Sequence, residues 1–155
     1  MAFDAFLKID GIPGESTDDK HKNEIEVLSF TFGISRKNER SRPSAADFSV
    51  VKRVDTASPL LFDAACEGDT IKSASFTARK AGKGQQEFLI ITMQEVIITS
   101  VQPSGAPGTD SLPMESVSLD FQTLEMEVFK QSPDGSLGGS TKTVCSSRRG
   151  PKEER

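Results

Sequence analysis

The stretch TIKSASFTARKAGKGQQEFLIITMQEVIITS, residues 70–100, decides the fold class. It contains two runs rich in β-branched and aromatic residues, 70–80 and 87–100, separated by the turn AGKG at residues 81–84. Two such runs around a short glycine-bearing turn predict an antiparallel β-hairpin. Residues 88–98 are apolar at both parities. We therefore expect core on one face of this strand and a neighbouring subunit on the other.

Alternation of apolar and polar residues predicts further strands on both sides of this hairpin. They lie at residues 2–10, 24–36, 47–54 and 115–130. In two of them the apolar side chains change parity, after Val27 and again after Phe121. A parity change indicates a β-bulge or a strand that is covered on each face in turn. We expect the second bulge near Gln122 and Thr123.

One short helix is predicted between these strands. Ser58 suits its N-cap, Pro59 its first helical position and Gly68 its C-terminal stop. A helix of two to three turns does not persist alone, so Leu61 and its neighbours must pack on the sheet. The predicted fold class is mainly β, an antiparallel β-barrel with one short α-helix, because closure removes the edges of long strands.

Length and cysteine content fit one domain without a disulfide framework. A chain of 155 residues matches the size of a single domain, and we assign it to residues 1–149, with a mobile charged tail at 150–155. Cys66 and Cys145 are expected to be independent reduced thiols, with Cys66 packed on the helix. A bridge between them stays open, because sequence does not give its geometry.

The charge and the apolar runs exclude several classes of function. A formal net charge of −4 argues against general nucleic-acid binding, which needs a concentrated positive surface. No apolar run reaches the roughly 20 residues that cross a membrane, and the first residues lack the pattern of a signal peptide. We expect a cytoplasmic protein without membrane insertion, which leaves the cell only by a route that reads no cleaved leader.

Side chains that carry chemistry are sparse. His21 is the single histidine and lies in a charged loop, which favours a solvated position over a catalytic or metal-binding one. The GKG at residues 82–84 lacks the Walker spacing and is typical of a hairpin tip. A basic cluster has no interleaved aromatic residue, which favours protein contact or solvation. It consists of Arg36, Lys37, Arg40 and Arg42, with Glu39 among them.

Two groups of carboxylates are the remaining candidates for a metal-binding or catalytic site. Asp18, Asp19 and Glu24 lack the spacing of a calcium loop, which favours a charged surface turn. Glu125 and Glu127 share a strand face, and we expect an exposed row there, or alternatively the lining of a channel or of a subunit boundary. We therefore predict no enzyme, no catalytic site, no cofactor and no metal.

Short segments along the chain occur in the order that a known family shares. They are AFDAFLKI at 2–9, GES at 14–16, EIEVLSF at 24–30, SP at 58–59, RKAG at 79–82 and EFLIITM at 87–93. Together they cover most of residues 1–130, and the last two are the most specific. On these segments the chain resembles the haemolysin-coregulated proteins (Hcp) of type VI secretion systems. It departs from them at 142–149, where KTVCSSRR replaces a Trp-containing strand.

The resemblance implies a structural role. Members form hexameric rings that stack into a hollow tube inside a contractile sheath, and the tube is expelled with a spike and can carry effectors. The implied partners are therefore further copies of the chain, the sheath, the spike and effector proteins. By position alone, the candidates for ring-to-ring contact are Lys37, Asn38, Glu39, Arg40, Arg42, Gly14 and Gly105.

Other functions remain open at this point. A phage-like tail-tube subunit has the same architecture, and a monomeric ligand-binding barrel of the lipocalin type has the same strand content. A tube protein with toxic enzymatic activity is disfavoured, because the 25 residues after Lys130 are too few for a catalytic domain.

Overall fold

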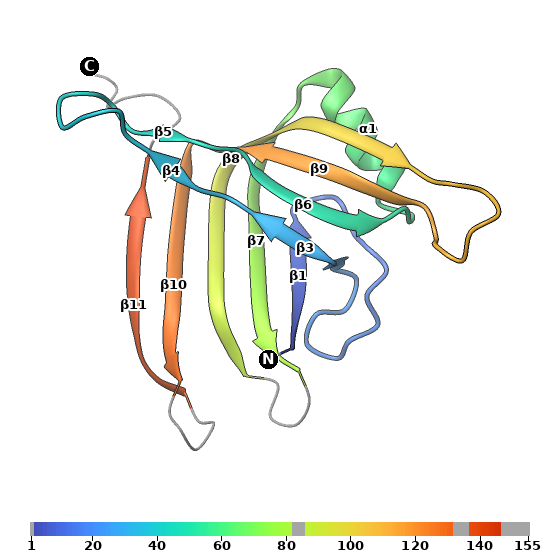
Figure 1. Ribbon diagram of the computed structural model, residues 1–155, viewed down its shortest axis with the longest axis horizontal. Coiled ribbons are helices and arrows are strands. Elements are labelled where there is room, and N and C mark those ends of the chain that lie inside the picture. The colour runs from blue at the N-terminus through green and yellow to red at the C-terminus, as the bar shows by residue number, and fades with distance from the viewer. Residues whose placement is uncertain (1, 82–85, 132–136, 147–155) are drawn as a thin grey trace.

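The computed structural model describes residues 2–81, 86–131 and 137–146, and these form antiparallel strands and one helix (Figure 1). The helix α1 (Ser58–Glu67) lies between β6 and β7 in the chain. The strands are β1 (Phe3–Ile9), β2 (Ile25–Val27), β3 (Ser29–Thr31), β4 (Ile34–Ser35), β5 (Ser44–Ala45), β6 (Phe48–Arg53), β7 (Thr70–Lys80), β8 (Glu87–Ser104), β9 (Met114–Asp120), β10 (Thr123–Gln131) and β11 (Leu137–Cys145). The predicted fold class is confirmed.

Nine of the strands belong to one sheet. Its order is β2-β1-β7-β8-β9-β6-β3, with β10 paired to β8 and β11 paired to β10, while β4 and β5 form a separate ribbon. Strands β7 and β8 pair antiparallel from Thr70 opposite Ile97 to Arg79 opposite Glu87, which confirms the predicted hairpin. The glycines of its turn, at 82 and 84, lie outside the described residues, as does the predicted tail at 150–155.

The long strand β8 is the place where the sheet branches. Its first part pairs with β10, up to Gln94 opposite Thr123, and its second part pairs with β9, from Ile97 onward. Between the two parts, Glu95 takes a left-handed backbone conformation with a φ of 54°. The Gln122 N–H donates to the Gln94 carbonyl at 3.0 Å across this irregularity. The pairing register is nevertheless the same on both sides of this irregularity, with Asp120 opposite Ile97 and Thr123 opposite Gln94. No residue is inserted, so the bulge expected near Gln122 and Thr123 is wrong. The strand predicted at 115–130 is instead interrupted between β9 and β10, which follow one edge of β8 in succession.

Beyond the branch, the two halves of the sheet are arranged differently. Strand β9 pairs with β6, and β6 pairs with β3, so that this half curls over the core. Strand β10 pairs with β11, and this half runs out from the body of the molecule (Figure 1). We call β10 and β11 together the flap.

The single long strand predicted for residues 24–36 is wrong, because the chain bends twice there. Strand β2 pairs with β1, and β3 pairs with β6, so the bend at Leu28 joins the two ends of the sheet order. The Leu28 N–H donates to the Val51 carbonyl at 2.8 Å. The parity change after Val27 marks this transfer from one part of the sheet to another. The sheet thereby curls into a barrel-like body.

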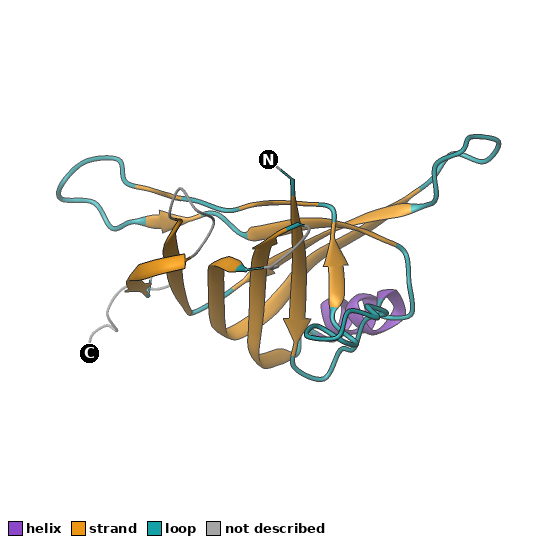
Figure 2. Cartoon of the chain, turned by 90° about the horizontal axis from the view of Figure 1, so that it is seen from below, coloured by secondary structure: helices purple, strands orange, loops and turns teal. Residues whose placement is uncertain are grey.

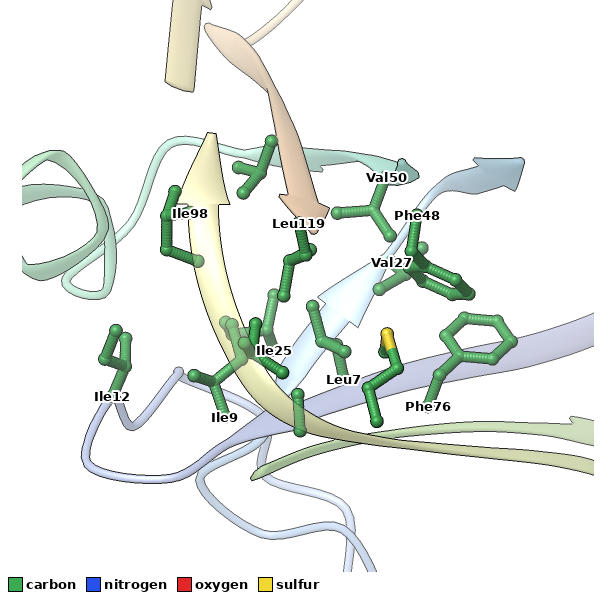
Figure 3. Packing of buried hydrophobic residues seen from close by; sticks show 14 of the residues in the cluster. Leu7, Ile9, Ile12, Ile25, Val27, Phe48, Val50, Phe76, Ile98 and Leu119 are labelled. Atoms are coloured by element: carbon green, nitrogen blue, oxygen red, sulfur yellow. The ribbon is translucent and has the colours of Figure 1, made fainter. Parts of the chain in front are cut away.

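Side chains fill the interior of this body (Figure 3). Phe48 and Phe76 are fully buried with ring centroids 5.2 Å apart, and Ile91, Met93 and Leu119 are equally inaccessible. Each such side chain contributes about 1.5–3 kcal/mol through burial. This packing provides stability and leaves the core as a filled barrel, which argues against the lipocalin-type alternative.

The helix α1 covers one end of the barrel. Leu61 and Ala64 are buried, and Gly68 ends the helix with a φ of 70° and an N–H donated to the Ala64 carbonyl at 3.0 Å. The predicted cap is wrong by one residue, since Ala57 occupies the N-cap and Ser58 is the first helical residue. The prediction that Cys66 packs on the helix is also wrong, because Cys66 lies on the exposed side. Both cysteines are free.

Candidate assembly surfaces

The ribbon of β4 and β5 projects from the barrel (Figures 1 and 2). Its tip is held by local hydrogen bonds. The Asn38 side-chain oxygen accepts the N–H groups of Arg40 and Ser41 at 2.9 and 3.0 Å, and the Ser41 hydroxyl accepts the Asn38 N–H at 2.8 Å. Arg36 donates to the Glu39 carbonyl at 3.2 Å. This side-chain-to-backbone pattern preforms the turn before any partner binds.

The projecting tip carries a concentrated positive charge. Between residues 36 and 42 the chain has four basic side chains and one acidic side chain, although its net charge is −4. Five of the candidate contact residues lie together here and all five are exposed. They are Lys37, Asn38, Glu39, Arg40 and Arg42. The structure therefore places them on one surface that another molecule can reach.

The two candidate glycines lie elsewhere. A Cβ at Gly14 would lie 2.5 Å from the Glu24 carbonyl oxygen, so glycine is required for close backbone approach. The Gly14 N–H donates to the Asn23 carbonyl at 2.7 Å, which closes the loop of residues 14–24. Gly105 begins the exposed connection from β8 to β9, at the opposite end of the molecule from the basic tip (Figure 2). The structure thus does not bring the seven candidates into one site.

The flap is the second surface open to a partner. Strand β11 pairs with β10 alone among the described strands, so its other edge is free. Val128 and Val144 are 43% and 56% exposed, and they lie on opposite faces of the flap according to the pairing register. A free edge beside exposed apolar side chains is a surface that pairs readily with another chain.

Glu125 and Glu127 lie half-buried on one face of the flap. Lys142 Nζ is 3.4 Å from Glu125, and the Ser140 hydroxyl donates to Glu127 at 2.7 Å. Each carboxylate thus has a partner across the strand pair. These contacts fit a row of surface charge and not a pair of carboxylates set for acid–base chemistry.

His21 is buried, so the predicted solvated position is wrong. Its ring stacks on Phe6 with centroids 4.4 Å apart and an interplanar angle of 6°. Nδ1 lies 3.0 Å from a Glu24 oxygen, and Nε2 lies 2.8 Å from a Glu87 oxygen. Phe6 has the outward parity of β1 and needs a cover, which the loop of residues 14–24 supplies. The apolar Phe6 at a polar position of β1 was the available signal.

Arg79 fixes the same loop from β7. Its guanidinium donates to both oxygens of Asp18, at 2.8 and 2.6 Å, and lies 4.8 Å from the centre of the Phe6 ring. The bonds from Arg79 hold the pKa of Asp18 at about 2, below its usual 3.8. The bonds to Asp18 also raise the pKa of Arg79. The sequence indicated Arg79 only as part of a family segment.

A buried ion pair lies at the end of the barrel that α1 covers. Lys52 and Glu115 are each 1% exposed and pair directly across β6 and β9. Lys52 also donates to Asp55 at 2.9 Å, and the Ser58 hydroxyl donates to Glu115 at 2.7 Å. Neither charge was predicted to be buried. Their parity, shared with Val50 and Val117, was the signal that places them inside.

Among the described residues, these clusters of polar side chains do not form a catalytic site or a metal-binding site. Both ring nitrogens of His21 are engaged by carboxylates, so neither faces a serine or a cysteine. Among the described residues, no cluster of three or more His, Cys, Asp or Glu side chains can hold a metal ion. No helix in the described ranges is long and apolar enough to cross a membrane.

Together, a filled barrel, a projecting charged tip and an open flap define a structural subunit that associates through its surfaces. Residues 6–128 match the family model described as type VI secretion system effector, Hcp. The chain is 36% identical over 148 residues to protein hcp1 of Pseudomonas aeruginosa, covering 90% of this chain and 91% of that one.

Solved structures agree with this match. Hcp1 from Salmonella typhimurium is 38% identical, with a TM-score of 0.82 and 96% of each chain covered. A type VI secretion system effector from Yersinia pestis is 34% identical, with a TM-score of 0.79, covering 92% of this chain and 99% of that one. The chain belongs to the Hcp family. It is a structural tube protein of type VI secretion and not an enzyme.

Proposed function

We propose that six copies of this chain close into a ring, and that the rings stack into a hollow inner tube. The tube is made in the cytoplasm, expelled with a spike by a contracting sheath, and loaded with effector proteins. The chain then leaves the cell without a cleaved signal peptide. The observation that carries this proposal is the flap, an open two-stranded extension that the described part of the chain leaves uncovered. Nucleic acid and membrane insertion have no part in this function.

The flap supports ring formation through its free edge. Strand β11 is nine residues long, and its side chains are exposed or only half-buried. In a closed ring, one surface of each subunit contacts a different surface of the next subunit. The free edge of every β11 strand is then covered by a neighbour. An open edge of this length on a monomer is prone to uncontrolled pairing, and closure removes that hazard. We assign residues 1–149 to the assembling domain.

The basic tip supports stacking. Its turn is preformed, so little conformational entropy is lost when it docks. Its five candidate residues are Lys37, Asn38, Glu39, Arg40 and Arg42, and we assign the ring-to-ring contact to them. We assign Gly105 to the same ring-to-ring contact, at the other projecting end of the molecule. Gly14 acts indirectly, through the closed shape of its loop.

Charge reversal at the tip separates stacking from ring formation. In the variant Lys37→Glu/Arg40→Glu, we expect rings of unchanged size and a loss of stacked rings, counted by negative-stain electron microscopy of concentrated protein. Raising the salt from about 0.1 to 1 M should have the same effect on the wild-type protein, because the screening length falls from about 10 to 3 Å.

Lys72→Glu provides the control, since Lys72 is exposed on β7, away from the tip. This variant should stack as the wild type does. Stacking by the tip variant at wild-type frequency would contradict the contact assigned to these residues. A wild-type protein that stays monomeric in the same experiment would contradict the ring itself.

A further inference from the structure

The loop of residues 14–24 is a closed unit. The Ser16 N–H donates to the Glu24 carbonyl at 3.0 Å, and the Asn23 N–H donates to the Ser16 carbonyl at 2.8 Å. The bond from Gly14 to Asn23 completes the set. These bonds tie the two ends of the loop together. Side-chain contacts then hold the loop against the barrel.

His21 makes one of these contacts at each ring nitrogen. Nδ1 is 3.0 Å from Glu24, within the loop, and Nε2 is 2.8 Å from Glu87, at the start of β8. An ionised carboxylate only accepts hydrogen bonds, and a neutral imidazole has a single N–H. Both contacts are hydrogen bonds at the same time only when the ring carries protons on both nitrogens.

Several charged groups lie around His21. The carboxylates of Glu24 and Glu87 face the ring, and the Asp18 side chain accepts the His21 backbone N–H at 3.2 Å. Among the described residues, Arg79 is a cation that contacts this cluster; it lies over the Phe6 ring and is itself engaged by Asp18 and Asp4. Lys20 and Lys22 flank His21 in the chain and are exposed. Both ring nitrogens of His21 thus contact carboxylates.

We propose that His21 is a protonation-dependent clasp that locks the loop of residues 14–24 to the start of β8. As the imidazolium, the ring bridges Glu24 and Glu87. When the ring releases one proton to solvent, one carboxylate faces a nitrogen lone pair, and its hydrogen bond is lost. Glu87 is 35% exposed and Glu24 only 14%, so the contact to Glu87 opens first. The loop then loosens from the barrel and uncovers Phe6, which is now 4% exposed.

Nuclear magnetic resonance tests the clasp directly, because the chain has one histidine and its ring signals need no assignment by mutation. Below the titration of the ring we expect both ring nitrogens of the full chain to show the ¹⁵N shifts of a protonated imidazole. As the pH is raised until the ring loses a proton, the amide protection factors of Ser16, Asn23 and Glu24 should fall together. Protection factors are corrected for the intrinsic effect of pH on exchange.

The variant Glu87→Gln removes one carboxylate and keeps the size of the side chain. Protection of the same three amides below the ring titration should drop several-fold, because the Gln oxygen still accepts from the ring N–H but lacks the charge that strengthens the bond. Asp19→Asn is the matched control, because Asp19 is an exposed carboxylate of the same loop, and it should leave protection unchanged. Protection that stays constant through the ring titration, or that is unchanged in Glu87→Gln, would overturn the proposal.

Discussion

The two halves of the sheet, divided at Glu95 on β8, differ in how they bury their side chains. On the barrel side, Val117 and Leu119 of β9 are inaccessible, because β6 and the core cover them. On the flap side, Val128 of β10 is 43% exposed, and β11 has no covering layer among the described elements. The same strand β8 thus supports one half that a single chain covers and one half that, in our proposal, further copies complete.

This difference separates stability from assembly. The barrel side supplies the apolar burial that holds the chain folded. The flap adds backbone hydrogen bonds and surface contacts, which contribute little to folding and are available for association. Changes on the barrel side should therefore alter the free energy of unfolding, and changes on the flap should alter the size of the particle.

The largest effect on stability is expected at the buried ion pair. Lys52→Met leaves the Glu115 charge buried without its partner, which should lower the free energy of unfolding by about 3–5 kcal/mol. Urea denaturation measures this loss. The double variant Lys52→Met/Glu115→Leu removes both charges and should recover most of it. If the single variant were as stable as the wild type, the pair would not be sealed inside the barrel.

A smaller effect on the free energy of unfolding is expected at Asp18, which binds the loop of residues 14–24 to Arg79. Its pKa is lowered to about 2 in the folded chain against 3.8 without the contact. A lowered carboxyl pKa stabilises the fold above about pH 3.8, and this contribution is lost as the pH falls toward 2. Asp18→Asn should cost about 1.5–3 kcal/mol at pH 7 and flatten the dependence of stability between pH 4 and 2.

Urea unfolding at pH 7, 4 and 2 tests this prediction. Asp19→Asn is again the matched control, because it removes an exposed carboxylate one position along the same loop. It should keep the stability of the wild type at pH 7. An unchanged pH dependence in Asp18→Asn would show that other carboxylates control stability in this range.

Much of the barrel could be predicted from sequence because strand alternation reports burial on one face. Strand β7 coincides with the run predicted from residue 70 to residue 80. The apolar parity shifts at Gln122 where the chain passes from β9 to β10, although the register contains no bulge there. The strand predicted at 24–36 failed because parity does not distinguish a bulge from a bend. At Leu28 the chain leaves one part of the sheet for another.

The surface features were harder to predict for a physical reason. Strand β11 contains glycine, serine and threonine and has no buried face, so it carries no alternation to detect. Lys52 and His21 are polar residues in buried positions, and they are stable there only through partners distant in sequence, Glu115 and Glu87. Pairings of this kind depend on the three-dimensional arrangement of the strands, which local patterns do not give.

The smallest effect on stability, and the largest on assembly, is expected at the flap. Val128→Asp/Val144→Asp places charges on both exposed faces of β10 and β11, where no core is disturbed. The free energy of unfolding should change by only about 0.5 kcal/mol. Subunit contacts that bury these positions should be lost.

Light scattering coupled to size-exclusion chromatography measures the outcome. The wild-type chain should elute with a mass several times the 16.8 kDa of one copy, and the flap variant should elute as a folded monomer. A wild-type chain that remains at 16.8 kDa at tens of micromolar concentration would contradict the claim that the flap is completed by other copies.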